Sequence, residues 1–308
     1  AGTAIYLRQQ GTESVGAVSP LSEEALERWA ALPTITVIPF ETIAGDDAET
    51  YLARGIAADL TTDLSRLSGL RVISGPSPVP PGKSAGEGAT KHGPRYLLSG
   101  AVQRAKGSLR INVRLVNAES GSQLWAERYD RPFDDLLAVQ EEIIHHLLKT
   151  LPVQVSEAEK QRLAQRYTRN LAAYDYFLRG RSAFLTRQRD ENAIAREMYR
   201  KAIELDPAFA RAYAGLALTY ADEYRNQWAS DGKRSLETAA QLAETALQID
   251  PGIPDVYSVL GYVRAVHHDY PQALQLHERA VRLDPSYADG YAYIAATYSH
   301  LGKPERAI

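Results

Sequence analysis

One short phrase recurs three times in the C-terminal half of the sequence and constrains the fold more than any other feature. The phrases ELDP, QIDP and RLDP end at Pro207, Pro251 and Pro285, which lie 44 and 34 residues apart. A period of 34 residues is typical of a repeat built from two paired helices. One such pair cannot bury its apolar face alone, so we expect the pairs to stack into a curved solenoid with a concave surface.

The residues before the third phrase follow the tetratricopeptide pattern. Tyr257 stands where that pattern has Trp, and its later positions hold Leu260, Gly261, Ala273, Ala280 and Pro285. Small residues suit helices that approach closely, and Pro after Asp ends the second helix of each pair. We therefore predict tetratricopeptide repeats over residues 171–308, about three and a half of them, with the last one truncated. The extra ten residues of the 44-residue step fall around the stretch EYRNQWASDGKR.

The concave side of such a solenoid is a binding surface that carries no chemistry. The repeat pattern gives the candidate groove for a protein or peptide partner as Arg211, Leu218, Asp222, Asp255, Ser258, Tyr262, Val266, Asp289 and His300, with Ala292 and Ala296 on the same side. The alternative to partner contact, for any single residue of this set, is that its side chain faces solvent or packs between two repeats. The Lys and Asn pattern with which chaperone-binding repeats hold a C-terminal carboxylate is absent from the sequence.

The N-terminal half has the pattern of a small α/β domain. The run TITVIPF, residues 34–40, is short, apolar and β-branched, as in a buried strand. An amphipathic helix follows, ended by Gly69, with its apolar face at Leu52, Ile56, Leu60, Leu64 and Leu67. The run LRVIS, residues 70–74, predicts a second strand. Strand, helix and strand at these lengths form a βαβ unit with parallel strands.

Three further runs, residues 95–105, 108–117 and 122–130, predict an antiparallel meander. A turn at Lys106-Gly107 pairs Val102 with Ile111. In the next hairpin, keeping the apolar faces together predicts the pairs Leu115–Leu124, Val113–Ala126, Arg114–Trp125 and Asn112–Glu127. The last two pairs would lie on a polar and aromatic outer face, either as an ordinary exposed surface with a cation–π pair or as a ligand surface.

A helix from Phe133 to Leu151 then buries Leu136, Leu137, Ile143, Ile144, Leu147, Leu148 and Leu151. A capping box at Ser156 and Glu159 opens a connecting helix into the repeats. The predicted organisation is a linker or juxtamembrane segment (1–32), the α/β domain with a small mixed sheet (33–152), the connecting helix (153–170) and the all-α solenoid (171–308).

Three stretches of the α/β half resemble a known domain: residues 35–74, residues 96–131 and LLAVQEEI at 136–143. They are similar to the TolB-N-like α/β domain that is joined to tetratricopeptide repeats in bacterial signalling proteins. The resemblance covers residues 33–308 and includes AYDYFLRGR at the junction. In that family the module follows a class III adenylate cyclase or a CadC-type winged-helix domain, commonly with one membrane span between. The resemblance therefore implies a sensory or scaffolding segment on the periplasmic side of the inner membrane, with a cytoplasmic position as the alternative.

Catalytic, metal and cofactor sites are not indicated. The stretch PPGKS around Lys83 looks like a phosphate-binding loop, but the first Gly of that motif would have to stand where the chain has Ser77. Four prolines in the loop also lack the N–H groups that cradle a phosphate. The pairs His145-His146 and His267-His268 do not have the i, i+4 spacing of a helical zinc site. The absence of Cys excludes disulfides and thiolate ligands.

The net charge of −3 gives no basic field, so nucleic acid is not expected to bind this fragment. We predict a non-catalytic sensory and protein-interaction module that couples a ligand or partner to an upstream effector. One alternative is the regulatory portion of a class III adenylate cyclase, and another is a pH-sensing periplasmic domain that uses its seven histidines. Residues 1–7 could end a membrane span, and homo-oligomerisation is left open.

Overall fold

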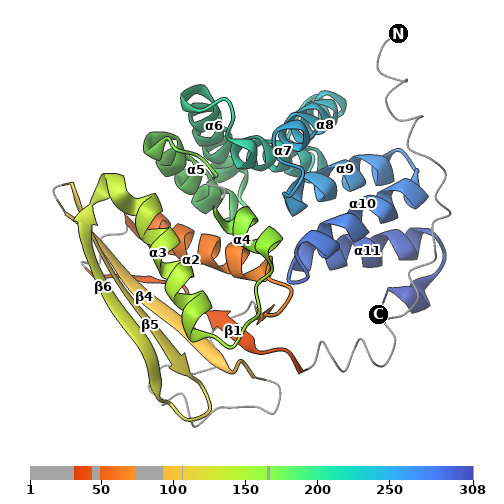
Figure 1. Ribbon diagram of the computed structural model, residues 1–308. Helices are drawn as coiled ribbons and strands as arrows, with labels where there is room; N and C mark the ends of the chain where they lie inside the picture. Colours follow the sequence, from red (N-terminus) through yellow and green to blue (C-terminus); the bar gives the residue numbers. More distant parts are fainter. Residues whose placement is uncertain (1–30, 44–48, 74–92, 106, 165–166, 308) are drawn as a thin grey trace. The chain divides into compact units, whose positions relative to one another are not determined.

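The structure, a computed structural model, describes residues 31–43, 49–73, 93–105, 107–164 and 167–307. It confirms the fold class: a small α/β domain with a mixed sheet precedes an all-α tetratricopeptide-type solenoid (Figure 1). The elements belong to the compact unit of residues 33–308. Residues 1–7 and the proline-rich loop at 74–92 lie outside the described residues. Within the described residues, none of the helices combines the length and hydropathy that crossing a membrane requires.

Six described strands form one mixed sheet in the order β3-β1-β4-β5-β6, with β2 paired to β4 off this path. Strands β1 (Thr34–Val37) and β3 (Arg71–Val72) are parallel, with α2 (Thr50–Ser65) between them in sequence. This confirms the βαβ unit. The predicted first strand is interrupted after Val37, because Pro39 has no N–H to give to a ladder, and pairing resumes at β2 (Glu41–Thr42).

The meander consists of β4 (Tyr96–Ala105), β5 (Ser108–Asn117) and β6 (Gln123–Pro132). Val102 lies opposite Ile111 as predicted. The predicted register of the second hairpin is wrong by one residue. Leu115 faces Trp125, and the neighbouring observed pairs are Arg114–Ala126, Val113–Glu127 and Asn112–Arg128, with a shift in the ladder between Leu115 and Val116.

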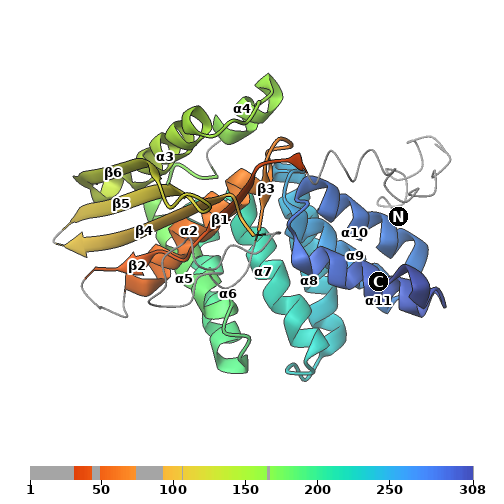
Figure 2. The same ribbon diagram turned by 90° about the horizontal axis from the view of Figure 1, so that it is seen from below.

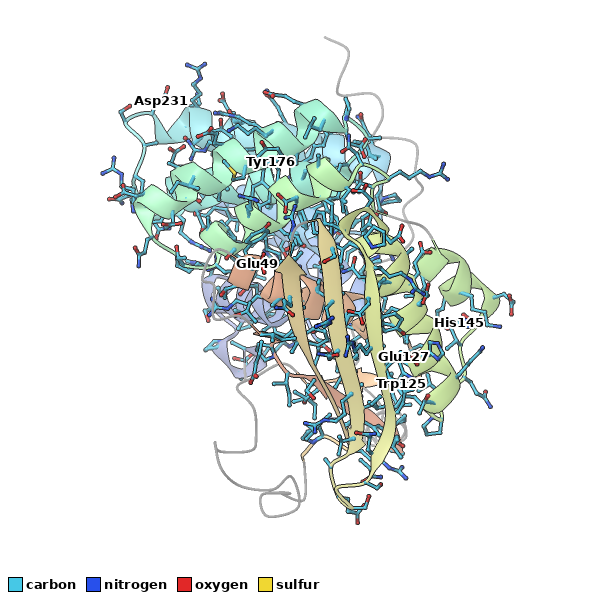
Figure 3. The ribbon with its side chains drawn as sticks, turned by 90° about the vertical axis from the view of Figure 1, so that its left-hand side faces the viewer. Glu49, Trp125, Glu127, His145, Tyr176 and Asp231 are labelled. Atoms are coloured by element: carbon cyan, nitrogen blue, oxygen red, sulfur yellow. The ribbon has the colours of Figure 1, made fainter. Side chains whose placement is uncertain are left out.

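The reason for the different register is the size of the aromatic side chains on β6. Trp125 and Tyr129 lie on the core face of the strand, where Tyr129 is buried and Trp125 stacks on His146 at 5.4 Å between ring centroids. Two aromatic rings bury more apolar area than Leu124 and Ala126, so they decide which face turns inward. Glu127 shares this face at the sheet edge, beside the helix that carries His145 (Figure 3). The expected Arg114–Trp125 cation–π pair does not form.

Helices α2 and α3 (Leu136–Thr150) lie side by side on one face of the sheet, with the 3-10 turn η3 (Phe133–Asp135) leading into α3 (Figure 1). Most of the predicted α3 face is buried, but Leu137 and Leu148 are only half-buried. The capping box at α4 (Glu157–Ala164) is confirmed. The backbone N–H of Ser156 donates to Glu159 at 2.8 Å, and that of Glu159 donates to Ser156 Oγ at 3.3 Å.

Three helix pairs and a further helix follow one another along the chain (Figures 1 and 2). Their bounds are α5 (Leu171–Phe184), α6 (Arg189–Leu205), α7 (Ala210–Arg225), α8 (Gly232–Ile249), α9 (Pro254–Val266), α10 (Tyr270–Leu283) and α11 (Ala288–His300), and a short turn η4 (Pro304–Arg306) comes last. The extra ten residues of the long step are taken up by α7, α8 and the loop between them, because these two helices have 16 and 18 residues where α9 and α10 have 13 and 14.

The recurring Asp-Pro phrase has a structural cause. Each Asp follows the last residue of a second helix, and its Oδ1 accepts the backbone N–H two residues on: Asp206 from Ala208, Asp250 from Gly252 and Asp284 from Ser286, at 2.7–3.0 Å. Such a turn ends the helix and redirects the chain into the next pair. Gly261 is required by packing, since a Cβ there would lie 2.5 Å from the His277 ring of α10.

A cross-linking experiment tests the observed register. Because the chain has no Cys, a disulfide can only form where two are introduced. We expect Val113→Cys with Glu127→Cys to form one, since directly opposed residues lie within bonding reach. The matched pair Val113→Cys with Ala126→Cys would place the thiols on opposite faces and stay reduced. Non-reducing electrophoresis with thiol alkylation distinguishes the two, and the reverse result would contradict the observed register.

Candidate functional site: a buried charge contact and the repeat groove

Helix α2 has two buried faces, which the apolar pattern alone did not reveal. Leu52, Ile56, Leu60 and Leu64 pack on the sheet, as the sequence predicts. A second stripe at Gly55, Asp59 and Asp63, four residues apart, faces α5, α7 and the segment just before α5. A Cβ on Gly55 would lie 2.7 Å from Leu178 of α5, so glycine lets the two helices approach. Helix α2 thus lies between the sheet and the solenoid (Figures 1 and 2).

Asp59 is the centre of this contact, with 3% of its side chain exposed. Arg181 of α5 and Arg211 of α7 both donate to Asp59 Oδ1, at 2.8 and 2.6 Å. The hydroxyl of Tyr174 donates to Oδ2 and accepts from Gln140 of α3 at 2.9 Å. Burial alone would raise the pKa of Asp59, but the charges of the two arginines lower it below its ordinary value. The carboxylate therefore stays ionised inside the protein.

Aromatic rings enclose the Arg211 side chain. Its guanidinium carbon lies 4.1 Å from the ring centroid of Tyr167 and 4.8 Å from that of Phe177. Burial would lower the pKa of Arg211, but the Asp59 charge raises it. Cation–π contacts of this kind are stronger away from water. The ion pair is therefore desolvated, and it holds α2, α5 and α7 together, although Nη1 of Arg211 is buried without a hydrogen-bond partner among the described residues.

Asp63, one turn further along α2, has a different environment. Its carboxylate accepts a hydrogen bond from the Tyr167 hydroxyl. No ion pair of Asp63 is found among the described residues, in contrast to Asp59. Burial raises the pKa of Asp63 to about 6. This group therefore changes its protonation near neutral pH.

The Asp-Pro turns of the repeats also contact the rest of the chain. Thr168, before α5, donates to Asp206 of the first turn. Arg66, after α2, donates to the carbonyl of Gly252 in the second turn at 3.4 Å. Ser286 of the third turn donates to the carbonyl of Val72 in β3 at 2.8 Å. The second and third turns therefore attach the α/β domain to the solenoid, in addition to the contact at Asp59.

The structure places the predicted groove residues in different environments. Arg211 is 9% exposed and belongs to the contact with α2 rather than to an open groove surface. Ser258 is also buried. Leu218 is half-buried between two apolar clusters. Asp255 accepts a hydrogen bond from Tyr287 at 3.1 Å.

A charged cluster at the end of α7 brings two of the predicted residues together. Arg187 lies in the α5–α6 turn. Its Nη1 is 3.3 Å from Oδ2 of Asp222, and its Nη2 is 3.6 Å from Oδ2 of Asp289 on α11. Arg225 also pairs with Asp222 and donates to the Tyr293 hydroxyl at 2.7 Å. Asp222 is buried, and this burial raises its pKa despite the two arginines. These charges connect α7 with α11.

Aromatic rings form a continuous line across the later repeats. Tyr262 of α9 lies 6.3 Å from Tyr224 of α7 and 6.1 Å from Tyr293 of α11, measured between ring centroids. Tyr293 also stacks on His277 at 5.0 Å. Burial lowers the pKa of His277 to about 4, so its ring is neutral at pH 7. We call Tyr224, Tyr262 and Tyr293 the aromatic line.

The last predicted residues lie beyond this line. Val266 is half-buried at the end of α9, while Ala292, Ala296 and His300 are exposed on α11. His300 stacks on Tyr270 at 5.2 Å. Apolar rings next to charged groups can contact a peptide without any covalent chemistry. Partner binding by these residues stays a prediction.

Sequence reasoning missed Asp59, Asp63, Tyr167 and Tyr174. The available signal was the stripe Gly55, Asp59 and Asp63 on a helix whose other face already accounts for the sheet contact. A surface helix usually carries long charged side chains beside its apolar face, and α2 has glycine and short carboxylates there instead.

No protein-family model matches the chain. A curated bacterial relative, "Putative adenylate cyclase 3" of Rhizobium meliloti (strain 1021), is 36% identical over 233 residues, which are 75% of this chain and 40% of that protein. The chain thus spans two fifths of the relative's length.

Solved structures similar to this chain are repeat domains. The first TPR of Spaghetti, bound to an HSP90 peptide, is 17% identical with a TM-score of 0.35, and covers 43% of this chain and 98% of that one. The Arabidopsis OM64 TPR domain is 20% identical with a TM-score of 0.35, and covers 42% and 98%. The repeat assignment itself rests on the helix pairs and the Asp-Pro turns.

We expect Asp59→Asn to destabilise the protein strongly. An amide cannot neutralise Arg181 and Arg211, so two guanidinium groups remain near the interface without their counter-ion. Removing one partner of a buried ion pair costs about 3–5 kcal/mol. Urea unfolding followed by circular dichroism measures the change, with the exposed Asp134→Asn as control. A loss below about 1 kcal/mol, the range of a surface pair, would contradict the central place of Asp59.

Asp63→Asn should have the opposite effect, and its size should depend on pH. A carboxyl whose pKa is about 6 in the folded protein and 3.8 when unfolded stabilises the fold below pH 3.8, and this contribution is lost as pH rises through 6. The amide stays neutral throughout. The free energy of unfolding of Asp63→Asn relative to wild type should therefore rise by about 1–3 kcal/mol from pH 4 to pH 7. A difference that is flat with pH would show that Asp63 titrates normally.

Proposed function

We propose that this chain is a non-catalytic sensory and protein-interaction module, which couples a partner or ligand to an effector domain in a longer protein. The observation that carries the proposal is the buried Asp59–Arg211 ion pair, which joins the α/β domain to the first helix of a repeat pair. The tetratricopeptide-type solenoid supplies an interaction surface. The resemblance to modules of bacterial signalling proteins supports a periplasmic position as part of the same proposal.

The partner surface in this proposal is the part of the groove around the aromatic line. The contact with α2 occupies Arg211 at the start of α7, whereas Tyr262, Val266 and the exposed face of α11 lie further along. Tyrosine rings supply apolar area and a hydroxyl, and such residues are enriched in protein interfaces. An extended peptide with apolar side chains suits this surface.

Helix α7 can transmit the effect of a partner to the α/β domain. It carries Arg211 near its first residue and Asp222 and Arg225 at its end, and it is continuous over 16 residues. A partner that displaces Arg225 from Tyr293 would therefore act on α7, and Arg211 at the start of the same helix forms the ion pair with Asp59. This gives the proposed coupling a contiguous physical route.

Affinity capture tests the groove. Tyr262→Ala with Val266→Ala should lose partners that wild-type residues 1–308 retain, because the two changes remove apolar contact area. The control is Ile194→Ala with Leu205→Ala, two exposed apolar residues on α6, the second helix of a pair. Circular dichroism confirms that each variant is folded. If the groove variant retains every wild-type partner, the groove is not the binding surface.

The similarity to the Rhizobium protein favours a second candidate, the regulatory portion of an adenylate cyclase. In this case the effector is a cyclase domain elsewhere in the chain's longer protein. The contact needed for regulation would be the one at Asp59, since it links the two parts of the module. This candidate and the first differ only in the identity of the effector.

A cyclic AMP assay separates the two candidates. The cyclase candidate predicts that the full-length product of the gene synthesises cyclic AMP, and that Asp59→Asn changes the rate because it loosens the contact. Asp134→Asn serves as the matched control. If the full-length protein produces no cyclic AMP, the cyclase candidate is wrong, while the interaction module is unaffected.

A further inference from the structure

A pocket of about 480 Å³ lies between α2, α3 and α4, separate from the groove. This volume is within the range of small-molecule sites. Its apolar wall consists of Leu137, Ile144 and Leu148 from α3 and Leu163 from α4. Leu137 and Leu148, which the sequence predicted to be buried, are half-buried because they line this pocket.

Two carboxylates of α2, Asp59 and Asp63, line the pocket. Asp59 is fully engaged by Arg181 and Arg211. Asp63 accepts a hydrogen bond from Tyr167 and has no ion pair among the described residues. A carboxylate can accept several hydrogen bonds, so Asp63 retains capacity for a donor that enters the pocket.

The charged groups around the pocket favour a cation. Glu142 of α3 lines it together with Asp63. Lys160 also lines it, but its ammonium group pairs with Glu157 at 2.6 Å. His146 stacks on Trp125, and His145 lies beside it. Carboxylates therefore outnumber available cations among the described lining residues.

We propose that this pocket binds a small amphipathic amine, with its ammonium group on Asp63 and its apolar body against Leu137, Ile144 and Leu148. A desolvated ammonium–carboxylate hydrogen bond at Asp63 and an apolar wall beside it give both affinity and orientation. This inference stands on the pocket alone and goes beyond the proposed function of the groove. Because Tyr167 contacts both Asp63 and Arg211, the amine would bind next to the contact that joins the two parts of the module.

Fluorescence titration with two matched probes tests the proposal. Dansylcadaverine carries a primary amine on an apolar dansyl group, and dansyl-6-aminohexanoic acid has the same fluorophore with a carboxylate. We expect the amine to bind residues 1–308 saturably, with a blue-shifted emission, and the acid not to bind. In Asp63→Asn the affinity for the amine should fall about tenfold or more, as expected for loss of a charged hydrogen bond. Asp134→Asn should bind the amine like wild type.

A second variant checks the position of the apolar body. Leu148→Trp fills the pocket and should abolish binding, whereas Asp63→Asn removes only the charge. Misfolding does not explain a loss in Asp63→Asn, since neutralising this carboxyl, whose pKa is raised to about 6, should stabilise the protein at pH 7, and circular dichroism verifies this. The proposal is overturned if wild type does not bind the amine, if the acid binds equally well, or if either pocket variant binds the amine as tightly as wild type.

Discussion

The structure depends on one requirement: the carboxylate of Asp59, buried in the middle of α2, must be compensated. A buried charge without partners is far more costly than a buried ion pair with complete hydrogen bonding. Two arginines from different helices and a tyrosine hydroxyl meet this requirement. Since those groups come from α5 and α7, the position of α2 on the sheet also fixes the first two repeat pairs.

This arrangement divides the inner side of the solenoid. Its early part, around Arg211, is occupied by the chain's own helix α2. Its later part carries the aromatic line, with Arg225 and Asp222 at the boundary.

The Asp-Pro turns have two structural roles. They end the second helix of each pair, and they also contact Thr168, Arg66 and Val72, which lie outside the repeats. A sequence feature that identifies the repeats is thus also part of the attachment between the two regions.

The sequence predicted local features well and long-range contacts poorly. The repeat period, the Asp-Pro helix ends and the Val102–Ile111 pair follow from local geometry, and the structure confirms them. The register of β6 was wrong because it is decided by how Trp125 packs on α3, which no local pattern contains. Arg211 was predicted to line the groove because the repeat pattern shows which face of α7 carries it. The pattern does not show that α2 packs against this face. Asp59 and Arg211 are 152 residues apart, and only the folded chain brings them together.

The central claim is that the α/β domain and the repeats unfold as one body because of the Asp59 contact. Two single-tryptophan variants test it directly, one retaining Trp125 on β6 and the other Trp228 in the α7–α8 loop, with the other tryptophans replaced by Phe. Urea unfolding followed by fluorescence should give coincident midpoints for the two reporters, and the midpoints should separate when Asp59→Asn is added. Two well-separated midpoints with Asp59 intact would contradict the account.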